Sequence, residues 1–295
     1  MMKRSGRSGC RHPLLRGIWV AVLIAVILCG LSLYQSKYRL EISRYEISSD
    51  KAADVIRFVQ ITDLHNSVFG GQNSDLIRAV SGQQPDFILM TGDMLNNYEI
   101  DSEIAVRLIR ELSEIAPVYF SYGNHEKDYE LRYGIDVTEM FEEAGARVLD
   151  GGCEDLVCQG VDIRLGGIYG YCLPGQDEGD GRPQETAFLE DFQKTDSLKI
   201  LMCHMPVSWI EYGSLESWQV DVIFAGHAHG GQVRLPLIGG LYAPDQGWFV
   251  GREEGLYKSQ DGKRTMVLSR GLGSSTIIPR FNNRPEIVVV DIVPE

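Results

Sequence analysis

The stretch VIRFVQITDLHN, residues 55–66, joins a run of β-branched and aromatic residues directly to a polar cluster that contains Asp63 and His65. The run over residues 55–62 predicts a β-strand, and the polar residues follow at its carboxyl end. In open α/β sheets, ligands bind beyond the carboxyl ends of the strands. This stretch therefore predicts both a strand of the sheet and the first part of a site.

Four later apolar runs, within residues 86–93, 117–126, 198–206 and 220–231, end in the same way. The polar residues at their ends are Asp93, Asn124, His125, His204, His227 and His229. Helical spacing over 73–83, 103–115, 126–144 and 206–215 alternates with these strands, which favours parallel pairing, and the strand-rich tail from about 248 predicts a second sheet packed on the first. The chain has six histidines. Five of them lie in these clusters, which argues against five unrelated solvated loops.

Length and charge narrow the function classes. A chain of 295 residues with 44% hydrophobic content buries a sizeable core, as one large α/β domain or two small ones. The net charge is −13, and five basic residues precede residue 17, so the rest of the chain is more acidic still. Such a surface repels polyanions, and we expect no nucleic-acid partner. A phosphate-bearing substrate would need a local positive focus, such as a bound divalent metal.

The N-terminus has the pattern of a membrane anchor. Residues 18–34 carry no charge, which is near the short limit of about 17 residues for a spanning helix. We predict a basic cytoplasmic flank over 1–17, a transmembrane signal anchor over 18–34, a linker over 35–54 and the main domain over 55–295. The basic flank places the N-terminus in the cytoplasm and the domain outside the cell membrane. A poor cleavage motif at residues 30–32 leaves open whether the segment is removed.

The six cysteines leave the redox compartment open. Cys153 and Cys158 flank a short segment that we expect to be a turn. They predict either a disulfide outside the cell or, as we favour, two packed thiols. No second pair of ligands accompanies them, so they do not form a zinc ribbon.

The clustered polar residues have the chemistry of metal ligands. The seven candidates are Asp63, His65, Asp93, Asn124, His204, His227 and His229. Carboxylate and amide oxygens with imidazoles and no thiolate suit Mn, Fe or Zn. Seven ligands exceed what one tetrahedral ion takes and fit two ions that share a carboxylate. Phosphatases and nucleases use such pairs of metal ions. The sequence therefore predicts a dinuclear hydrolase site.

The motifs DLH, GDM, GNHE, CHMP and GHAH, in this order, resemble the signature of the calcineurin-like metallophosphoesterases. The resemblance runs from about residue 55 to the C-terminus and implies a four-layer α/β/β/α sandwich of two packed mixed sheets. It assigns Asp63, His65 and His229 to one metal ion. It assigns Asn124, His204 and His227 to the other ion, with Asp93 bridging both.

The same resemblance implies catalytic roles for Asp93 and His125. A metal-bridging hydroxide would attack phosphorus in line, and His125 would protonate the leaving oxygen. For Glu126, next in the chain, two interpretations stay open: it orients its neighbour, or it is a solvated loop carboxylate.

The tail motifs, including GHAHGGQVRLPLIGGLYAP and PRFNNRPEI, resemble a membrane-associated bacterial subgroup that contains phosphodiesterases and UDP-2,3-diacylglucosamine pyrophosphatases. This implies a phosphorylated small molecule or a lipid-linked phosphate as substrate. An outward-facing domain would not meet a cytosolic UDP-linked precursor, so one of these two inferences must give way. Arg270 and Gln232 are candidate substrate contacts, as are Arg234, Arg280 and Arg284, and the alternative is that the arginines pair with protein carboxylates.

Two other classes of function compete with the enzyme. One is a catalytically inactive binding module of the same fold at the membrane, which would be expected to lack a ligand position, whereas no motif here is incomplete. The other is a structural membrane protein with solvated histidines. We expect a monomer.

Overall fold

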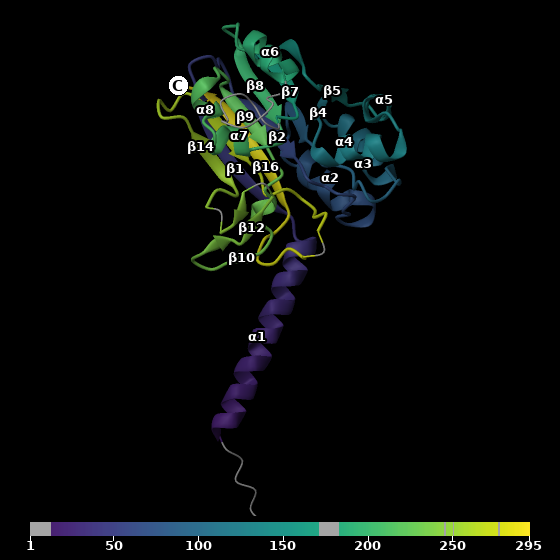
Figure 1. The fold of residues 1–295 in the computed structure, drawn as a ribbon, viewed down its shortest axis with the longest axis vertical. Helices are drawn as coiled ribbons and strands as arrows, with labels where there is room; N and C mark the ends of the chain where they lie inside the picture. Colours follow the sequence, from purple (N-terminus) through teal and green to yellow (C-terminus); the bar gives the residue numbers. More distant parts are fainter. Residues whose placement is uncertain (1–12, 171–182, 245, 250, 277) are drawn as a thin grey trace, which may run out of the picture.

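Two six-stranded mixed sheets pack face to face, with helices on both outer faces and a long N-terminal helix projecting from one end (Figure 1). The computed structural model describes residues 13–170, 183–244, 246–249, 251–276 and 278–295. The predicted four-layer α/β/β/α sandwich is confirmed.

The first sheet contains the strand of the opening stretch at an inner position. Its order is β1 (Glu41–Ser49), β16 (Glu286–Pro294), β2 (Ile56–Ile61), β3 (Phe87–Thr91), β4 (Val118–Ser121) and β5 (Arg147–Val148). β2 through β5 are parallel, whereas β16 runs antiparallel to β2 and parallel to β1. The carboxyl ends of β2, β3 and β4 therefore lie at one edge.

The second sheet has the same organisation. Its order is β14 (Gly255–Lys258), β15 (Thr265–Leu268), β9 (Val222–Ala225), β8 (Leu198–Cys203), β7 (Val161–Ile168) and β6 (Gly152–Cys158). β15, β9, β8 and β7 are parallel, and β14 and β6 pair antiparallel at the two edges. The carboxyl ends of β8 and β9 thus form a second edge.

Helices cover the outer faces of both sheets. The helices associated with the first sheet are α2 (Ser74–Ser81), α3 (Glu103–Ser113), α4 (Asn124–Tyr133) and α5 (Val137–Glu143). Those associated with the second are α6 (Pro183–Phe192), α7 (Val207–Ile210) and α8 (Ser214–Ser217). Beyond β9 lie a 3-10 turn at His229–Gly231 and two small hairpins, β10 (Arg234–Leu235) with β11 (Gly239–Gly240) and β12 (Tyr242–Ala243) with β13 (Gly247–Trp248).

Three apolar cores correspond to the three interfaces between these layers. Between the sheets, Phe58 stacks on Phe87 at 5.4 Å and meets Phe224 of the second sheet at 5.9 Å between ring centroids. Buried aromatic rings of this kind contribute large apolar areas. They hold the sheets together, so polar groups at the carboxyl-end edges of the two sheets are brought close to each other.

The N-terminal helix α1 (Pro13–Tyr38) is longer than the predicted apolar segment. The segment Arg16–Tyr38 is long and apolar enough to cross a membrane. Its most apolar 18-residue stretch is not buried against the described part of the domain. Its last turns contact the domain: the backbone N–H groups of Asn282 and Asn283 donate to the hydroxyls of Ser32 and Ser36 at 2.9 and 3.0 Å. The end of α1 is therefore fixed to the loop that precedes β16.

Three local expectations differ from the structure. The segment 35–54 is not only a linker, because it contains β1, whose nine residues pair with β16. The single helix expected over 126–144 is split into α4 and α5 by Gly134, which ends α4 at a φ of 66°. The helix expected over 206–215 is likewise two short helices, α7 and α8.

Cys153 and Cys158 lie on β6 rather than beside a turn, and both thiols are free. Five residues along a strand separate them by roughly 16 Å. This distance is too long for a disulfide and for direct packing. Neither alternative considered for this pair holds. Cys10 and Cys172 lie outside the described residues.

Candidate metal centre

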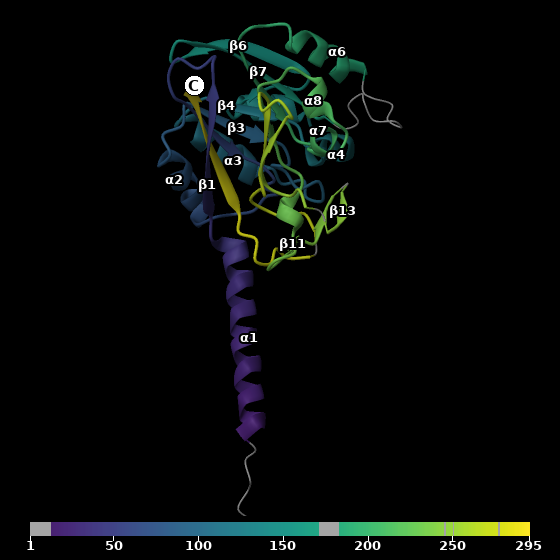
Figure 2. The same ribbon diagram turned by 90° about the vertical axis from the view of Figure 1, so that its left-hand side faces the viewer.

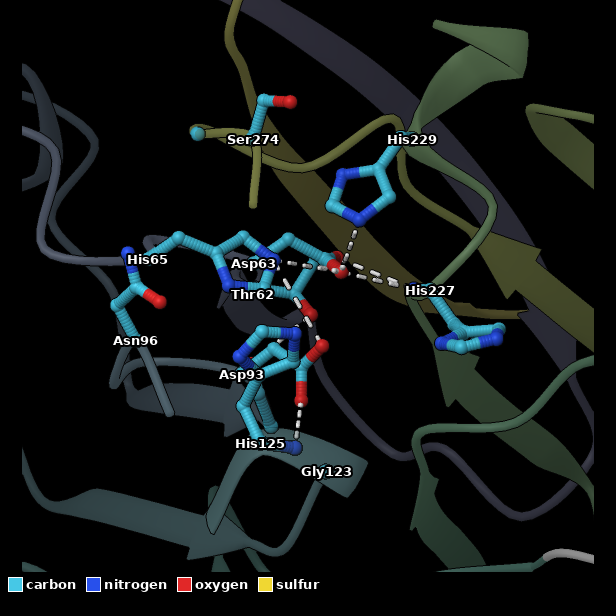
Figure 3. A network of polar contacts seen from close by, with 12 residues as sticks. Thr62, Asp63, His65, Asp93, Asn96, Gly123, His125, His227, His229 and Ser274 are labelled. Carbon is cyan, nitrogen blue, oxygen red and sulfur yellow. Dashed lines mark hydrogen bonds and ion pairs between the residues drawn. The ribbon is translucent and has the colours of Figure 1, made fainter. Parts of the chain in front are cut away.

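The predicted ligands converge where the carboxyl ends of the two sheets meet (Figure 3). Asp63 and His65 follow β2, Asp93 follows β3, and Asn124 begins α4 just after β4. From the second sheet, His204 follows β8, and His227 and His229 follow β9. The site is therefore assembled across the interface between the sheets.

Three overlapping groups of buried side chains place their ligand atoms within 4.8 Å of one another. They are Asp63 with His65 and His229, Asp93 with His204 and His227, and His65 with Asp93 and His125. The first two groups match the side chains assigned to each ion, apart from Asn124. Asp93 shares a group with residues of both, as a bridging carboxylate would.

The imidazole nitrogens face carboxylates at distances longer than most hydrogen bonds. Nε2 of His65 lies 3.6 Å from Oδ2 of Asp93 and 3.9 Å from Oδ1 of Asp63. Nε2 of His204 lies 3.3 Å from Oδ2 of Asp93, and Nε2 of His229 lies 3.6 Å from Oδ1 of Asp63. A cation between these nitrogens and oxygens would satisfy both.

Several buried polar atoms in this cluster lack a hydrogen-bond partner among the described residues. Among the described residues, both ring nitrogens of His65 and Oδ1 of Asn124 are buried without a hydrogen-bond partner. Leaving such groups unsatisfied costs about 1–3 kcal/mol each. The residues therefore fit a metal ion.

Strained backbone holds the candidate ligands in place. Asp63, His65, Asp93, His227 and His229 all adopt positive φ, between 46° and 68°. The left-handed region costs a non-glycine residue of the order of 1–2 kcal/mol, and such strain gathers at functional sites. At the two histidines after β9, this left-handed backbone directs the ring of His229 at Asp63 and that of His227 away from it (Figure 3).

Hydrogen bonds from the main chain orient the ligands. The backbone N–H of His227 donates to the carboxylate of Asp63 at 3.1 and 3.2 Å, which joins the two sheets. Nδ1 of His204 lies 2.7 Å from the carbonyl oxygen of Thr91. Donation to this carbonyl leaves Nε2 of His204 free to face Asp93, the usual arrangement behind a metal-binding imidazole. Sequence reasoning missed Thr91 because a backbone carbonyl leaves no signal in the side-chain pattern.

The local charges set the protonation of these groups in the absence of a metal. Burial lowers the pKa of His65 and of His229 to about 3. Burial also opposes charge on His204, but the Asp93 carboxylate raises the pKa of His204 to about 10. Burial would raise the pKa of Asp93, yet His204 and His65 hold it well below its usual range. His65 and His229 thus present neutral imidazoles near neutral pH.

His125 is placed beside this cluster. Its ring lies 4.4 Å from that of His65, and its Nδ1 accepts a hydrogen bond from the backbone N–H of Asn97 at 3.2 Å. Burial lowers the pKa of His125. An acceptor role for Nδ1 places the proton of the neutral ring on Nε2. Asn97 is a second residue that sequence reasoning missed, since it contributes through its main chain.

Glu126 is not a solvated loop carboxylate. It is fully buried and accepts hydrogen bonds from the backbone N–H groups of Asp93, Gly123 and Leu95, at 2.8, 2.9 and 3.0 Å. Burial, together with the charge of Asp93, raises the pKa of Glu126 to about 7, against the effect of the three N–H donors. This side chain fixes the loop that carries Asp93.

The candidate substrate contacts lie at the margin of the cluster, where their polar atoms face protein groups. The guanidinium of Arg270 pairs with Glu41, Glu254 and Glu286 at 2.9 to 3.2 Å. The amide nitrogen of Gln232 donates to the hydroxyls of Ser274 and Thr276. A substrate role for Arg270 and Gln232 stays a prediction.

The other three arginines behave in the same way. Arg234 pairs with Glu254, Arg284 donates to Gln35 at 2.8 Å, and the buried Arg280 donates to the carbonyl oxygen of Gly273 at 2.8 Å. Nη2 of Arg280 also lies 3.5 Å from Nδ1 of His229. Of the five polar candidates, Arg280 thus approaches a ligand directly.

A narrow apolar cavity of about 230 Å³ starts beside the cluster. His229 is one of its lining residues, together with Val233, Leu241, Trp248 and Ile278. This volume is below the roughly 300–1,000 Å³ of typical small-molecule pockets. The cavity therefore suits a small apolar group next to the polar site.

Comparison with known proteins agrees with this geometry. The calcineurin-like phosphoesterase family model matches residues 56–231, more than half of the chain. The chain is 26% identical over 293 residues to the uncharacterized metallophosphoesterase YkuE of Bacillus subtilis, covering 95% of this chain and 96% of YkuE. It is 28% identical over 264 residues to the phosphodiesterase YaeI of Escherichia coli, covering 86% and 88%. Among solved structures, it is similar to a dimetal phosphatase from Danio rerio, with a TM-score of 0.43 and 12% identity over 80% of this chain and 92% of that one.

The matched region contains all five motifs, from the Asp63 loop to the His229 turn, whose side chains gather at the meeting edges of the two sheets. The chain belongs to the calcineurin-like phosphoesterase family, as a metal-dependent hydrolase of phosphate esters.

Proposed function

We propose that the protein is a phosphodiesterase or pyrophosphatase that works with two divalent ions, which we take to be Mn, Fe or Zn. Asp63, His65 and His229 would hold one ion, and Asn124, His204 and His227 the other, with Asp93 between them. The observation that carries the proposal is the pair of buried ligand groups contributed by both sheets, with Asp93 in contact with members of each.

When bound, the two ions would polarise the phosphoryl oxygens and supply a water-derived nucleophile at neutral pH. The residues of the chain do the rest. The backbone N–H of Asp93 donates a hydrogen bond to Glu126, and the carboxylate of Asp93 accepts one from the backbone N–H of His125 at 2.9 Å. The central carboxylate is therefore preorganised. Because Nδ1 is engaged by Asn97, the N–H of Nε2 is the group of His125 that would donate a hydrogen bond to the departing oxygen.

We further propose that the substrate is a lipid-linked phosphate and that the domain lies on the outer face of the cell membrane. The apolar helix α1 supports the membrane placement, and the apolar cavity beside His229 supports a substrate with a hydrocarbon part. The phosphodiesterase name of the Escherichia coli relative favours a diester. A protease added to intact cells should cleave the domain if it faces outward, and protection until lysis would contradict this orientation.

The experiment that tests the activity is hydrolysis of bis(p-nitrophenyl) phosphate by the full-length chain in detergent with Mn²⁺. We expect turnover that a chelator removes and that added Mn²⁺ restores. Absence of turnover with every divalent ion tested between pH 5 and 9 would contradict the proposal. It would then favour the inactive binding module, which the complete set of ligands now argues against.

A further inference from the structure

Five large apolar side chains lie exposed at one end of the domain. We call Leu237, Ile238, Trp248, Phe249 and Ile278 the apolar rim. Ile278 is the least exposed of the five, at 51%, and Leu237 is fully exposed. Trp248 and Ile278 line one cavity, and exposed apolar side chains that lie together mark interaction sites rather than ordinary surface.

The rim is built on small, well-braced elements. Leu237 and Ile238 form the tip of the β10–β11 hairpin, and Trp248 ends the β12–β13 hairpin, where its ring contacts that of Tyr242 at 5.3 Å. The backbone N–H of Leu241 donates to the carbonyl oxygen of Val233 at 2.9 Å, which closes the base of the β10–β11 hairpin, and that of Phe249 donates to the carbonyl oxygen of Leu241 at 2.8 Å, which closes the base of the β12–β13 hairpin. The side chains are therefore displayed outward by a fixed scaffold.

The rim lies at the end of the domain from which α1 projects. Both views show the small hairpins β10–β13 at this end, near the last turn of the helix (Figures 1 and 2). Hydrogen bonds support this placement: the backbone N–H of Arg234 donates to the carbonyl oxygen of Phe281, and the next residue, Asn282, donates to Ser32 of α1. A bilayer spanned by α1 would have its surface at the level of the rim.

Exposed positive charge accompanies the rim, although the chain as a whole carries a net charge of −13. Lys37, Arg39 and Arg284 are exposed at the junction of α1 and the domain. Basic side chains close to a membrane surface attract anionic headgroups, each with about 1 kcal/mol at most when near the surface. Aromatic rings such as those of Trp248 and Phe249 also favour the boundary between hydrocarbon and water.

We propose that the apolar rim is a second membrane contact, inserted into the surface of the bilayer that α1 spans. The partner is the lipid bilayer itself, with its anionic headgroups opposite Lys37, Arg39 and Arg284. This contact holds the domain down on the membrane and brings Trp248 and Ile278, two exposed residues that also line the apolar cavity, against lipid. It rests on the membrane placement of α1 proposed above, and not on the phosphoesterase activity.

The test uses the full-length chain in vesicles of equal parts phosphatidylcholine and phosphatidylglycerol, with and without brominated acyl chains, which quench nearby tryptophan. Subtracting the emission of Trp248→Phe from that of the wild type isolates Trp248 from the other three tryptophans. We expect the Trp248 emission to be blue-shifted and to lose about half of its intensity or more to brominated lipid, as for an apolar face buried in the headgroup boundary.

A Leu237→Asp/Phe249→Asp variant should abolish this quenching. The matched control is Val157→Asp, which adds a charge at an exposed apolar position on β6 and should leave the quenching unchanged. Both variants should keep the wild-type rate on the soluble bis(p-nitrophenyl) phosphate, which shows that they are folded.

Each other outcome overturns the proposal. Chain that floats with the vesicles but shows a water-exposed, unquenched Trp248 has an anchor without a rim contact. Trp248 that is shielded from water yet unquenched, with shielding that depends on protein density, means that the rim joins two copies of the chain. Chain that does not float with the vesicles at all contradicts both the anchor and the rim contact.

Discussion

The buried carboxylate of Glu126 accepts a hydrogen bond from the backbone N–H of Asp93 at 2.8 Å, and its other oxygen accepts one from Leu95 at 3.0 Å. Glu126, in the first turn of α4, thus fixes the loop that follows β3. Asp93 is the residue shared between the two ligand groups, so its position controls both.

Glu126→Gln should weaken the site without removing a ligand. An amide NH₂ would face backbone donors, and each unsatisfied buried group costs about 1–3 kcal/mol. We expect weaker Mn²⁺ affinity and about 10-fold to 100-fold lower kcat, as for other groups that orient ligands. The control is Glu142→Gln on the exposed face of α5. Unchanged Mn²⁺ affinity in Glu126→Gln would show that the carboxylate has only a structural role.

Asp93→Ala should abolish activity and lower the metal content, because it removes the carboxylate that contacts both groups. Replacing residues that only orient ligands costs about 10-fold to 100-fold, so we expect a loss greater than about 100-fold. Metal analysis of the purified variant gives the number of ions per chain, with Asp162→Ala, an exposed position on β7, as the control. Full occupancy in Asp93→Ala would rule out its bridging role.

His125→Ala should behave differently, with activity lowered while both ions stay bound. A general acid contributes about 10²-fold to 10⁴-fold. The loss should be smallest for substrates whose leaving group needs no proton, such as p-nitrophenolate. A ligand atom of His125 also lies within 4.8 Å of those of His65 and Asp93. Loss of metal from this variant would therefore identify His125 as a metal ligand instead.

Metal binding should depend on pH through His204. Its pKa of about 10 keeps it protonated near neutral pH in the metal-free protein, whereas a ligand imidazole must be neutral. Affinity for Mn²⁺ should therefore rise with pH, by about tenfold per unit below that pKa, with one proton released on binding. His65 and His229, with pKa values of about 3, should add nothing to this slope. Titrations in a weak buffer measure both quantities, and an affinity independent of pH would refute the assignment.

Gly226→Ala should destabilise the fold at the contact between the sheets. A Cβ at this position would lie 2.3 Å from Oγ1 of Thr62 and 2.5 Å from Oδ2 of Asp63. Overpacking of this kind costs about 1–3 kcal/mol, measurable as a lower Tm. Gly152→Ala is the matched control because its Cβ would meet no heavy atom within 4 Å. Equal Tm values for the two variants would mean that the edges separate easily.

Much of the fold followed from local patterns. The apolar runs at 55–62, 86–93 and 198–206 were long enough to identify β2, β3 and β8, and the helices between them implied parallel pairing. Segment 35–54 escaped this reasoning, because β1 exists only through its pairing with β16 at the far end of the chain. Gly134 was overlooked as the end of α4, since a glycine inside a helical pattern does not by itself break it.

The sequence by itself predicted which side chains gather at the candidate site, because parallel strands in one sheet bring the residues at their carboxyl ends to the same edge. The tertiary structure decided how these side chains are divided between the two groups of candidate ligands. The left-handed backbone at His227 and His229 directs their rings into separate groups, Glu126 is drawn into the interior by three backbone donors, and Arg270 is surrounded by carboxylates from three separate segments of the chain. These outcomes depend on contacts between residues far apart in the chain, and no local pattern records such contacts.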